Sequence, residues 1–378
     1  MAEAGAHKWD FRARFRRNAF GWRSEPAIKG VKEAVSEIKK VARRDGVLAA
    51  EGAVLFLERV SPALAHVDSS SGAIGTAVNN AIAALAAIIA AAPVDEEGRA
   101  KWLERLFEAH AQDQIPCIET LGEYWGELCA SPEVASQWAD QLIGVTRMAL
   151  SSDKNLRGHF HGASACLSAL YAAGRYDDLL DVLKDERFWP YKRWAVKALA
   201  AQGKKAEAVR YAESSRSPWA SDLDIDRLCE ELLLSSGLID EAYQRYALRA
   251  NRAGTYLAWF RAIARKYPHK SPAEILEDLV EETPGEEGKW FGAAKDAGLF
   301  DEAIALAKRA PCSPQTLTRA ARDFEEKNPA FGSQAFAMRI ERTRHCHASW
   351  RNTIHDRPHP PSLRAEAGDG LARHQRNA

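Results

Sequence analysis

Apolar residues recur every three or four positions along most of the chain, which is the spacing of a helix that buries one face. No segment keeps a period-2 alternation, and no Asn-Gly or Asp-Gly pair joins two alternating segments as in a β-hairpin. Residues that favour helix, namely Ala, Leu, Glu, Arg and Lys, dominate the sequence. The pattern predicts an all-α protein.

A serine followed by a proline marks several helix starts. In Ser271-Pro272-Ala273-Glu274 the serine hydroxyl and the glutamate carboxylate can each accept an otherwise unpaired backbone N–H. Proline also suits the first position of a helix. The same pair of residues predicts further helix starts at Ser131, Ser217 and Ser313.

Composition divides the chain into four regions. Residues 1–45 form a basic N-terminal arm or helix, with twelve Lys and Arg against six Asp and Glu, and residues 46–150 are Ala-rich. Residues 151–342 carry helical repeats, and residues 343–378 hold too few apolar groups to form a core and are predicted to be disordered. In the Ala-rich region the apolar spacing predicts helices at 47–65, 73–92, 99–111, 114–129 and 132–150.

Four segments of the repeat region align on a glycine between two helices. The glycine can take the left-handed conformation that ends the first helix. The acidic residue that follows suits the positive N-terminus of the second helix, and the next residue, which is usually small, lets the two helices approach. The aligned residues are Gly174 with Asp178-Leu179, Gly203 with Glu207-Ala208, Gly237 with Glu241-Ala242, and Gly298 with Glu302-Ala303.

The spacings between these glycines are 29, 34 and 61 residues, and the last is about two units long. A divergent helix pair at 255–281, with its turn at Tyr267-Pro268, accounts for the missing unit. Helix pairs at such a period are typical of an α-solenoid of stacked antiparallel pairs.

The repeats resemble tetratricopeptide repeats, whose period is 34 residues. The likeness rests on the turn G-x-x-[DE]-[DE]-A, seen at 237–242 and 298–303, whereas the family's early Trp-x-x-Leu-Gly pattern is absent and unit lengths vary. The whole chain is also similar to uncharacterised bacterial helical-repeat proteins in segments such as 34–64 and 283–309. This second resemblance implies no activity.

Charge and cysteine content narrow the class of protein. Lys and Arg total 52 and balance 52 Asp and Glu, which argues against a dedicated nucleic-acid coat. The six cysteines form no C-x-x-C pair and are interpreted as buried free thiols of a reducing compartment. The N-terminus has no apolar signal segment, and the longest apolar run, 81–94, is shorter than the ~20 residues of a membrane span. We therefore expect a cytoplasmic protein without a membrane partner.

Aromatic residues alternate with arginines in the basic arm. The segment can pack an N-terminal helix on the rest of the protein, with the arginines turned to solvent. Alternatively it can bind nucleic acid or an acidic partner through phosphate contacts and stacking. Packing is the favoured interpretation. The aromatic residues are Trp9, Phe11, Phe15, Phe20 and Trp22.

Metal, cofactor and catalytic motifs are not recognisable. The tail residues His345 and His347 are too close for easy joint ligation, and Pro358 prevents a helical pair of His355 and His359. His159-Phe160-His161 is interpreted as a loop or helix start. The sequence contains no P-loop, no G-x-S-x-G and no H-E-x-x-H motif, so an enzyme would need an unfamiliar helical site.

The leading hypothesis is a non-enzymatic scaffold for protein–protein interaction. In stacked helix pairs the first helix of each pair lines a concave face, which here would bind an unidentified protein or an extended, acidic peptide. Because large aromatics are often buried, a core position is the alternative for the one tryptophan on this face. The predicted contact residues are Arg193, Lys197, Arg227, Trp259, Arg261, Arg265 and Lys289.

Overall fold

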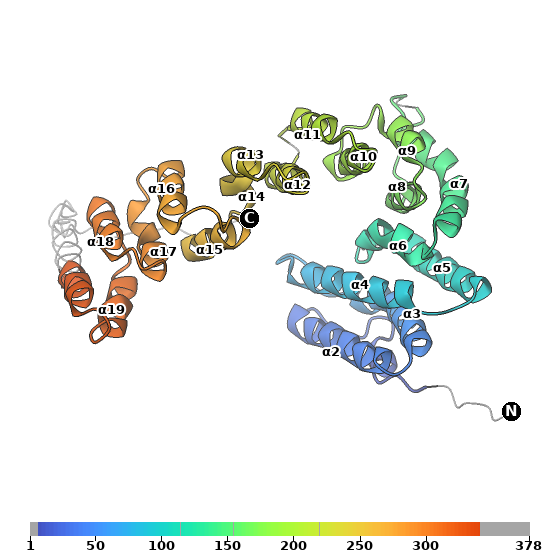
Figure 1. Ribbon diagram of the computed structural model, residues 1–378. Helices are drawn as coiled ribbons and strands as arrows, with labels where there is room; N and C mark the ends of the chain where they lie inside the picture. Colours follow the sequence, from blue (N-terminus) through green and yellow to red (C-terminus); the bar gives the residue numbers. More distant parts are fainter. Residues whose placement is uncertain (1–6, 114, 154, 219, 341–378) are drawn as a thin grey trace, which may run out of the picture. The chain divides into compact units, whose positions relative to one another are not determined.

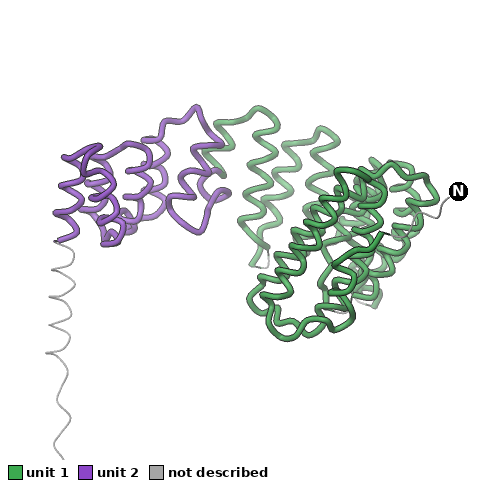
Figure 2. Tube along the Cα trace, turned by 90° about the horizontal axis from the view of Figure 1, so that it is seen from below, with its two compact units in different colours: residues 1–246 green, residues 247–378 purple. Residues whose placement is uncertain are grey.

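Every regular element is a helix in the part of the chain that the structure describes, which confirms the all-α prediction. The chain forms two compact units, residues 1–246 and 247–378, shown in different colours in Figure 2. The tail predicted to be disordered, with its five histidines and Cys346, lies outside the described residues. This computed structural model describes residues 7–113, 115–153, 155–218 and 220–340.

Unit 1 begins with long helices and continues with shorter ones. Figure 1 shows α6, α8, α10 and α12 along one side of this unit, and α7, α9 and α11 along the other. The boundary with unit 2 falls within the π-helix η2 (Tyr243–Ala247). The other elements are α1 (Phe11–Arg14), α2 (Ser24–Ala42), α3 (Gly46–Leu64), α4 (Ala73–Ala91), α5 (Glu96–Ala111), the 3-10 helix η1 (Glu119–Tyr124), α6 (Trp125–Cys129), α7 (Pro132–Ala149), α8 (Ala163–Ala172), α9 (Tyr176–Leu183), α10 (Trp189–Ala201), α11 (Lys205–Ser214), α12 (Asp222–Leu234) and α13 (Ile239–Ala242).

The aromatic residues of the N-terminal arm pack into the core formed by α2, α3 and α4. The rings of Phe11 and Phe15 lie 5.6 and 5.0 Å from the ring of Phe56 on α3. Trp9 is also buried, directly over Gly52, where an added Cβ would meet the indole. The packing interpretation is confirmed for these residues, but Trp22 is 72% exposed.

Helix α4 begins before the apolar run 81–94, because the polar residues Asn79 and Asn80 belong to the same helix. By length and composition the helix could cross a membrane, and 39% of its most apolar window is buried. Ile82, Leu85 and Ile89 are fully buried, and α4 contacts α2 and α3. The length argument from the 14-residue run alone was therefore too restrictive.

The predicted helix at 114–129 is not a single helix. Residues 115–118 are not helical, and the chain then enters the 3-10 helix η1 before α6. Pro116 lacks a backbone N–H and disfavours helix at the residue before it. The carboxylate of Asp113 accepts the backbone N–H of Ile118 at 2.6 Å, so a buried side chain holds the end of this connection.

The glycine-centred turns of the repeats are confirmed. All four glycines have a left-handed φ between 70° and 81°, as the end of a helix requires. The residue at the predicted small position is fully buried in each turn. These positions are Leu179, Ala208, Ala242 and Ala303.

Unit 2 contains short helices, with α15, α17 and α19 along one side and α16 and α18 along the other (Figure 1). The divergent pair is present as α15 and α16, at the predicted place. Residues 329–340 are also helical. The remaining elements are α14 (Leu248–Ala250), α15 (Tyr256–Lys266), α16 (Pro272–Glu282), the 3-10 helix η3 (Glu287–Trp290), α17 (Phe291–Asp296), α18 (Phe300–Arg309) and α19 (Pro314–Asp323).

The serine caps are confirmed in part. Ser271 and Glu274 form a complete capping box at the start of α16, and Ser131 accepts the backbone N–H of Val134 in α7. Ser313 precedes α19 but makes no side-chain cap hydrogen bond. The Ser217 prediction was wrong, because α12 begins only at Asp222 and is capped by Ser221.

Candidate functional site

A groove on unit 1 begins with an unusually close contact of η1 and α6 with α8. Gly122 and Gly126 lie four residues apart and therefore on one face. A Cβ added at Gly126 would lie 2.5 Å from both Ala172 Cβ and the carbonyl oxygen of Ser168. At Gly122 it would lie 3.0 Å from Ser164 Cβ. Small residues on both partners thus bring the helices together, and α8 forms a low floor between its neighbours.

Larger side chains from η1, α8 and α10 rise around this floor. They enclose a cavity of about 340 Å³. Tyr124, Tyr171 and Trp194 supply aromatic walls, and the rings of Tyr171 and Trp194 are 5.7 Å apart. We name this cavity the α10 groove. Its lining residues are Glu123, Tyr124, Gly126, Glu127, Ser168, Tyr171, Ala172, Trp194 and Lys197.

Opposite charges face each other across the α10 groove. Arg193 of α10 forms an ion pair with Glu123 of η1, so its charge is compensated within the protein. The ammonium of Lys197 lies 4.5 Å from the centre of the Trp194 ring. In the described residues, no ion pair includes Lys197 or Glu127.

Burial and neighbouring charges perturb the titration of the groove residues. Burial, and then the positive charge of Arg193, lower the pKa of Lys197 below its ordinary value, although nearby glutamates oppose the shift. Burial, and then Glu123 and Glu127, raise the pKa of Tyr124. Lysine, tyrosine and carboxylates therefore share one partly dry environment. It can bind a guest through aromatic contact and through one cation and one anion.

The predicted contact residues are divided between the two units. Arg193 and Lys197 meet at the α10 groove, and Arg227 is exposed on α12 in the same unit. Trp259, Arg261, Arg265 and Lys289 belong to unit 2. The described structure therefore joins only the first two of the seven into one site.

Trp259 is a core residue rather than an exposed contact. Its side chain is only 5% exposed, and its indole N–H donates to the carbonyl oxygen of Leu248 at 2.7 Å. Its ring lies 5.4 Å from that of Trp290, which is fully buried. The alternative interpretation of this tryptophan was correct, because stacking α15 against η3 requires a large side chain between them.

The other predicted residues of unit 2 are exposed, and two of them pair with carboxylates. Arg261 donates to Asp296 of α17 at 2.8 Å, and Lys289 lies 2.6 Å from Glu286. Arg265 is exposed on α15. The Arg261 pair connects α15 to α17, whereas the Lys289 pair lies within one turn at the start of η3, and both contribute little at an exposed surface.

The sequence reasoning missed the residues that shape the α10 groove. Gly122 and Gly126 were available as a signal, because a pair of glycines four positions apart on a helix marks a close approach. The matching stripe of Ser164, Ser168 and Ala172 on α8 has the same spacing. Glu123 and Glu127 precede the glycine-centred repeats, so the argument from the first helix of each pair does not include them.

The thiols and histidines show no metal centre. The five described cysteines are free, and burial raises the pKa of Cys117 and Cys129 to about 12. His159 Nε2 lies 3.4 Å from His161 Nδ1 in an exposed loop. Among the described residues, no group of three or more His, Cys, Asp and Glu is arranged to hold a metal ion.

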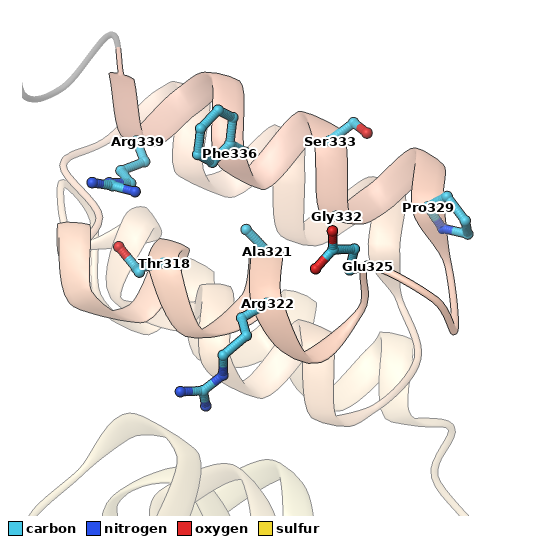
Figure 3. A pocket seen from close by; sticks show the side chains of 9 residues that line it. All are labelled: Thr318, Ala321, Arg322, Glu325, Pro329, Gly332, Ser333, Phe336 and Arg339. Carbon is cyan, nitrogen blue, oxygen red and sulfur yellow. The ribbon is translucent and has the colours of Figure 1, made fainter.

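Unit 2 has a separate hollow of about 470 Å³ between α19 and the helical residues 329–340. Figure 3 shows Phe336 facing Ala321 across it, with Arg322 pointing away. Phe336 is 47% exposed. None of the seven predicted contact residues lines this hollow.

Comparison with known proteins adds no relative to this description. No protein-family model matches the sequence, and no curated protein matches it.

Proposed function

We propose that the protein is a non-enzymatic binding scaffold, built as an α-solenoid of tetratricopeptide-like helix pairs. Its guest is an extended peptide segment of a partner protein, held in the α10 groove. The observation that carries the proposal is that Glu127 and Lys197 lie without ion-pair partners in one aromatic-walled cavity. Such a cavity offers apolar surface together with a few fixed polar groups, as binding sites generally do.

The guest must place an acceptor at Lys197. The ammonium is held over Trp194 at partial burial, so a carboxylate of the guest would form a charge-assisted hydrogen bond with it. Arg193 does not offer the same opportunity, because Glu123 already accepts from it. An acidic side chain of the peptide, directed at Lys197, therefore defines the first contact.

Glu127 sets the second contact. It is exposed on α6 and lines the same cavity as Lys197. A lysine, an arginine or a backbone N–H of the guest would donate a hydrogen bond to its carboxylate. The guest is thus a segment of mixed charge, with its acidic residue toward α10 and its donor toward α6. The aromatic rings of Tyr171 and Trp194 would cover the chain between these two points.

The cytoplasm is the proposed location. Buried free thiols with raised pKa values, such as that of Cys166, suit a reducing compartment and form no disulfide there.

Selection from a random peptide library displayed on phage tests the proposed function. The immobilised full-length protein should enrich peptides that contain an acidic residue, and calorimetry should then measure their affinity. Lys197→Glu should weaken binding at least about tenfold, because it places like charges together. The matched control is Lys204→Glu, an exposed lysine at the turn before α11. If the two variants lose the same affinity for the peptide, or if neither loses any, the groove is not the binding site.

A further inference from the structure

The loop that connects α1 to α2 is fixed at two points although it has no regular structure. Asn18 adopts a left-handed φ of 57°, which is uncommon for a residue other than glycine. Its backbone N–H donates to the carbonyl oxygen of Pro62 at 2.9 Å. The carbonyl oxygen of Trp22 accepts from the backbone N–H of Asp68, also at 2.9 Å. Residues 18–22 are thereby held against the C-terminal end of α3.

This fixed loop presents a single large aromatic ring to solvent. Trp22 is 72% exposed, which is the highest value among the exposed large apolar residues of the described chain. Its sequence neighbours Gly21 and Arg23 are exposed too. An exposed flat ring suits stacking against another flat ring.

Three arginines without ion-pair partners in the described structure lie close to Trp22 in the sequence. Arg16, Arg17 and Arg23 are exposed, and no ion pair within the described residues includes them. Arg14, in contrast, pairs with Glu33. Three uncompensated cations within eight residues of a fixed loop attract polyanions, and their attraction to phosphate requires no conformational change of the backbone.

A crevice of about 630 Å³ opens beside the same loop. Arg17 and Asn18 line it together with the apolar residues Pro62, Ala65 and Ile115. Glu58 also lines it, but its carboxylate forms an ion pair with Arg105. Ile115 is 42% exposed there. The crevice combines an apolar surface, an amide and a guanidinium, which are the groups that contact the face, the edge and the phosphate of a nucleotide.

We propose that this loop binds single-stranded nucleic acid at a site separate from the α10 groove. A base stacks on Trp22, a second base enters the crevice beside Asn18, and Arg16, Arg17 and Arg23 contact phosphates. Stacking on an exposed indole tolerates any base, since every base has a π-face. The bases of a duplex are already stacked on one another, so this arrangement favours a single strand.

Fluorescence anisotropy with a labelled twelve-nucleotide oligo(dT) and the full-length protein tests the proposal. We expect saturable binding that weakens as salt rises. Trp22→Ala should weaken it at least about fivefold, since stacking contributes about 1–3 kcal/mol per base. Changing Arg16, Arg17 and Arg23 together to alanine should reduce the slope of log affinity against log salt by about 2.

The matched control changes Lys39, Arg43 and Arg44 to alanine. These cations are exposed near the C-terminus of α2. Their substitution removes the same number of positive charges from the N-terminal region as the loop variant does. The control should bind oligo(dT) nearly as the wild type does. The proposal fails if the wild type does not bind, if the control loses as much affinity as the loop variant, or if poly-glutamate binds as tightly and Trp22→Ala has no effect. The last outcome would assign the loop to an acidic protein partner.

Discussion

The backbone N–H of Gly126 donates a hydrogen bond of 2.9 Å to the hydroxyl oxygen of Ser168. The same hydroxyl donates to the carbonyl oxygen of Glu123, also at 2.9 Å. One small side chain of α8 therefore satisfies a donor and an acceptor in the irregular start of α6. This contact keeps η1 and α6 close to α8 and leaves the space above α8 open as the α10 groove.

Gly126→Ala should destabilise unit 1 although alanine favours helix. The new Cβ would approach Ala172 Cβ and the Ser168 carbonyl oxygen to 2.5 Å, and a backbone atom cannot easily move away. Such overpacking costs about 1–3 kcal/mol. Urea unfolding followed by circular dichroism measures the change.

Gly144→Ala provides the control for this substitution. Gly144 is exposed within α7, and a Cβ there would have nothing within 4 Å. The substitution should therefore stabilise the protein by about 0.5–1 kcal/mol through helix propensity. Equal effects of the two substitutions would mean that α6 does not approach α8 as described.

Ala303→Leu should destabilise unit 2. Ala303 is fully buried at the small position after the Gly298 turn, and a leucine would force α18 away from its neighbour α17. We expect a loss of about 1–3 kcal/mol, and a similar loss for Ala242→Leu in unit 1. Ala206→Leu, at an exposed position of α11, should change the unfolding midpoint little. An unchanged midpoint for Ala303→Leu would contradict the assignment of the repeat.

Arg99→Met should destabilise the junction of α4 and α5. The buried guanidinium donates to the carbonyl oxygens of Ile89 at 2.6 Å and Ala92 at 2.9 Å, at the end of α4. Methionine fills a similar volume but removes the two charge-assisted hydrogen bonds, and each carbonyl oxygen keeps only a backbone N–H donor, at a cost on the order of 2 kcal/mol. Thermal unfolding should show a lower midpoint, with Arg99→Lys between methionine and the wild type. A midpoint equal to that of the wild type would mean that water replaces the guanidinium.

Alkaline pH should weaken the fold through its buried thiols. Burial raises the pKa of Cys166 to about 11, whereas the unfolded thiol titrates near 9.0. Because the folded pKa is the higher one, the stability it confers is complete below pH 9 and is lost between about pH 9 and 11. Relative to Cys166→Ala, the wild type should lose roughly 1 kcal/mol between pH 8 and pH 10. A parallel pH dependence of both proteins would show that this thiol is accessible.

The glycine-centred turns were readable from the sequence because their signals are local. A glycine that ends one helix, an acid that starts the next and a small residue directly after that acid act within about six positions, and the Gly298 turn follows this pattern. The α10 groove was less readable, because it depends on contacts across three elements. Arg193 looked like a free cation until its long-range contact with Glu123 was known. Trp259 likewise depends on Trp290, with which its contact cannot be inferred from spacing.

Charge reversal between protein and peptide tests the proposed binding site most directly. A library-selected peptide should lose at least about tenfold in affinity for Lys197→Glu, and a second peptide in which its acidic residue becomes lysine should recover most of that loss. The same lysine peptide should bind the wild type poorly, and Lys204→Glu should behave as the wild type with both peptides. If the reversed peptide does not recover affinity for Lys197→Glu, the acidic residue of the guest does not contact Lys197, and the proposed use of the α10 groove is contradicted.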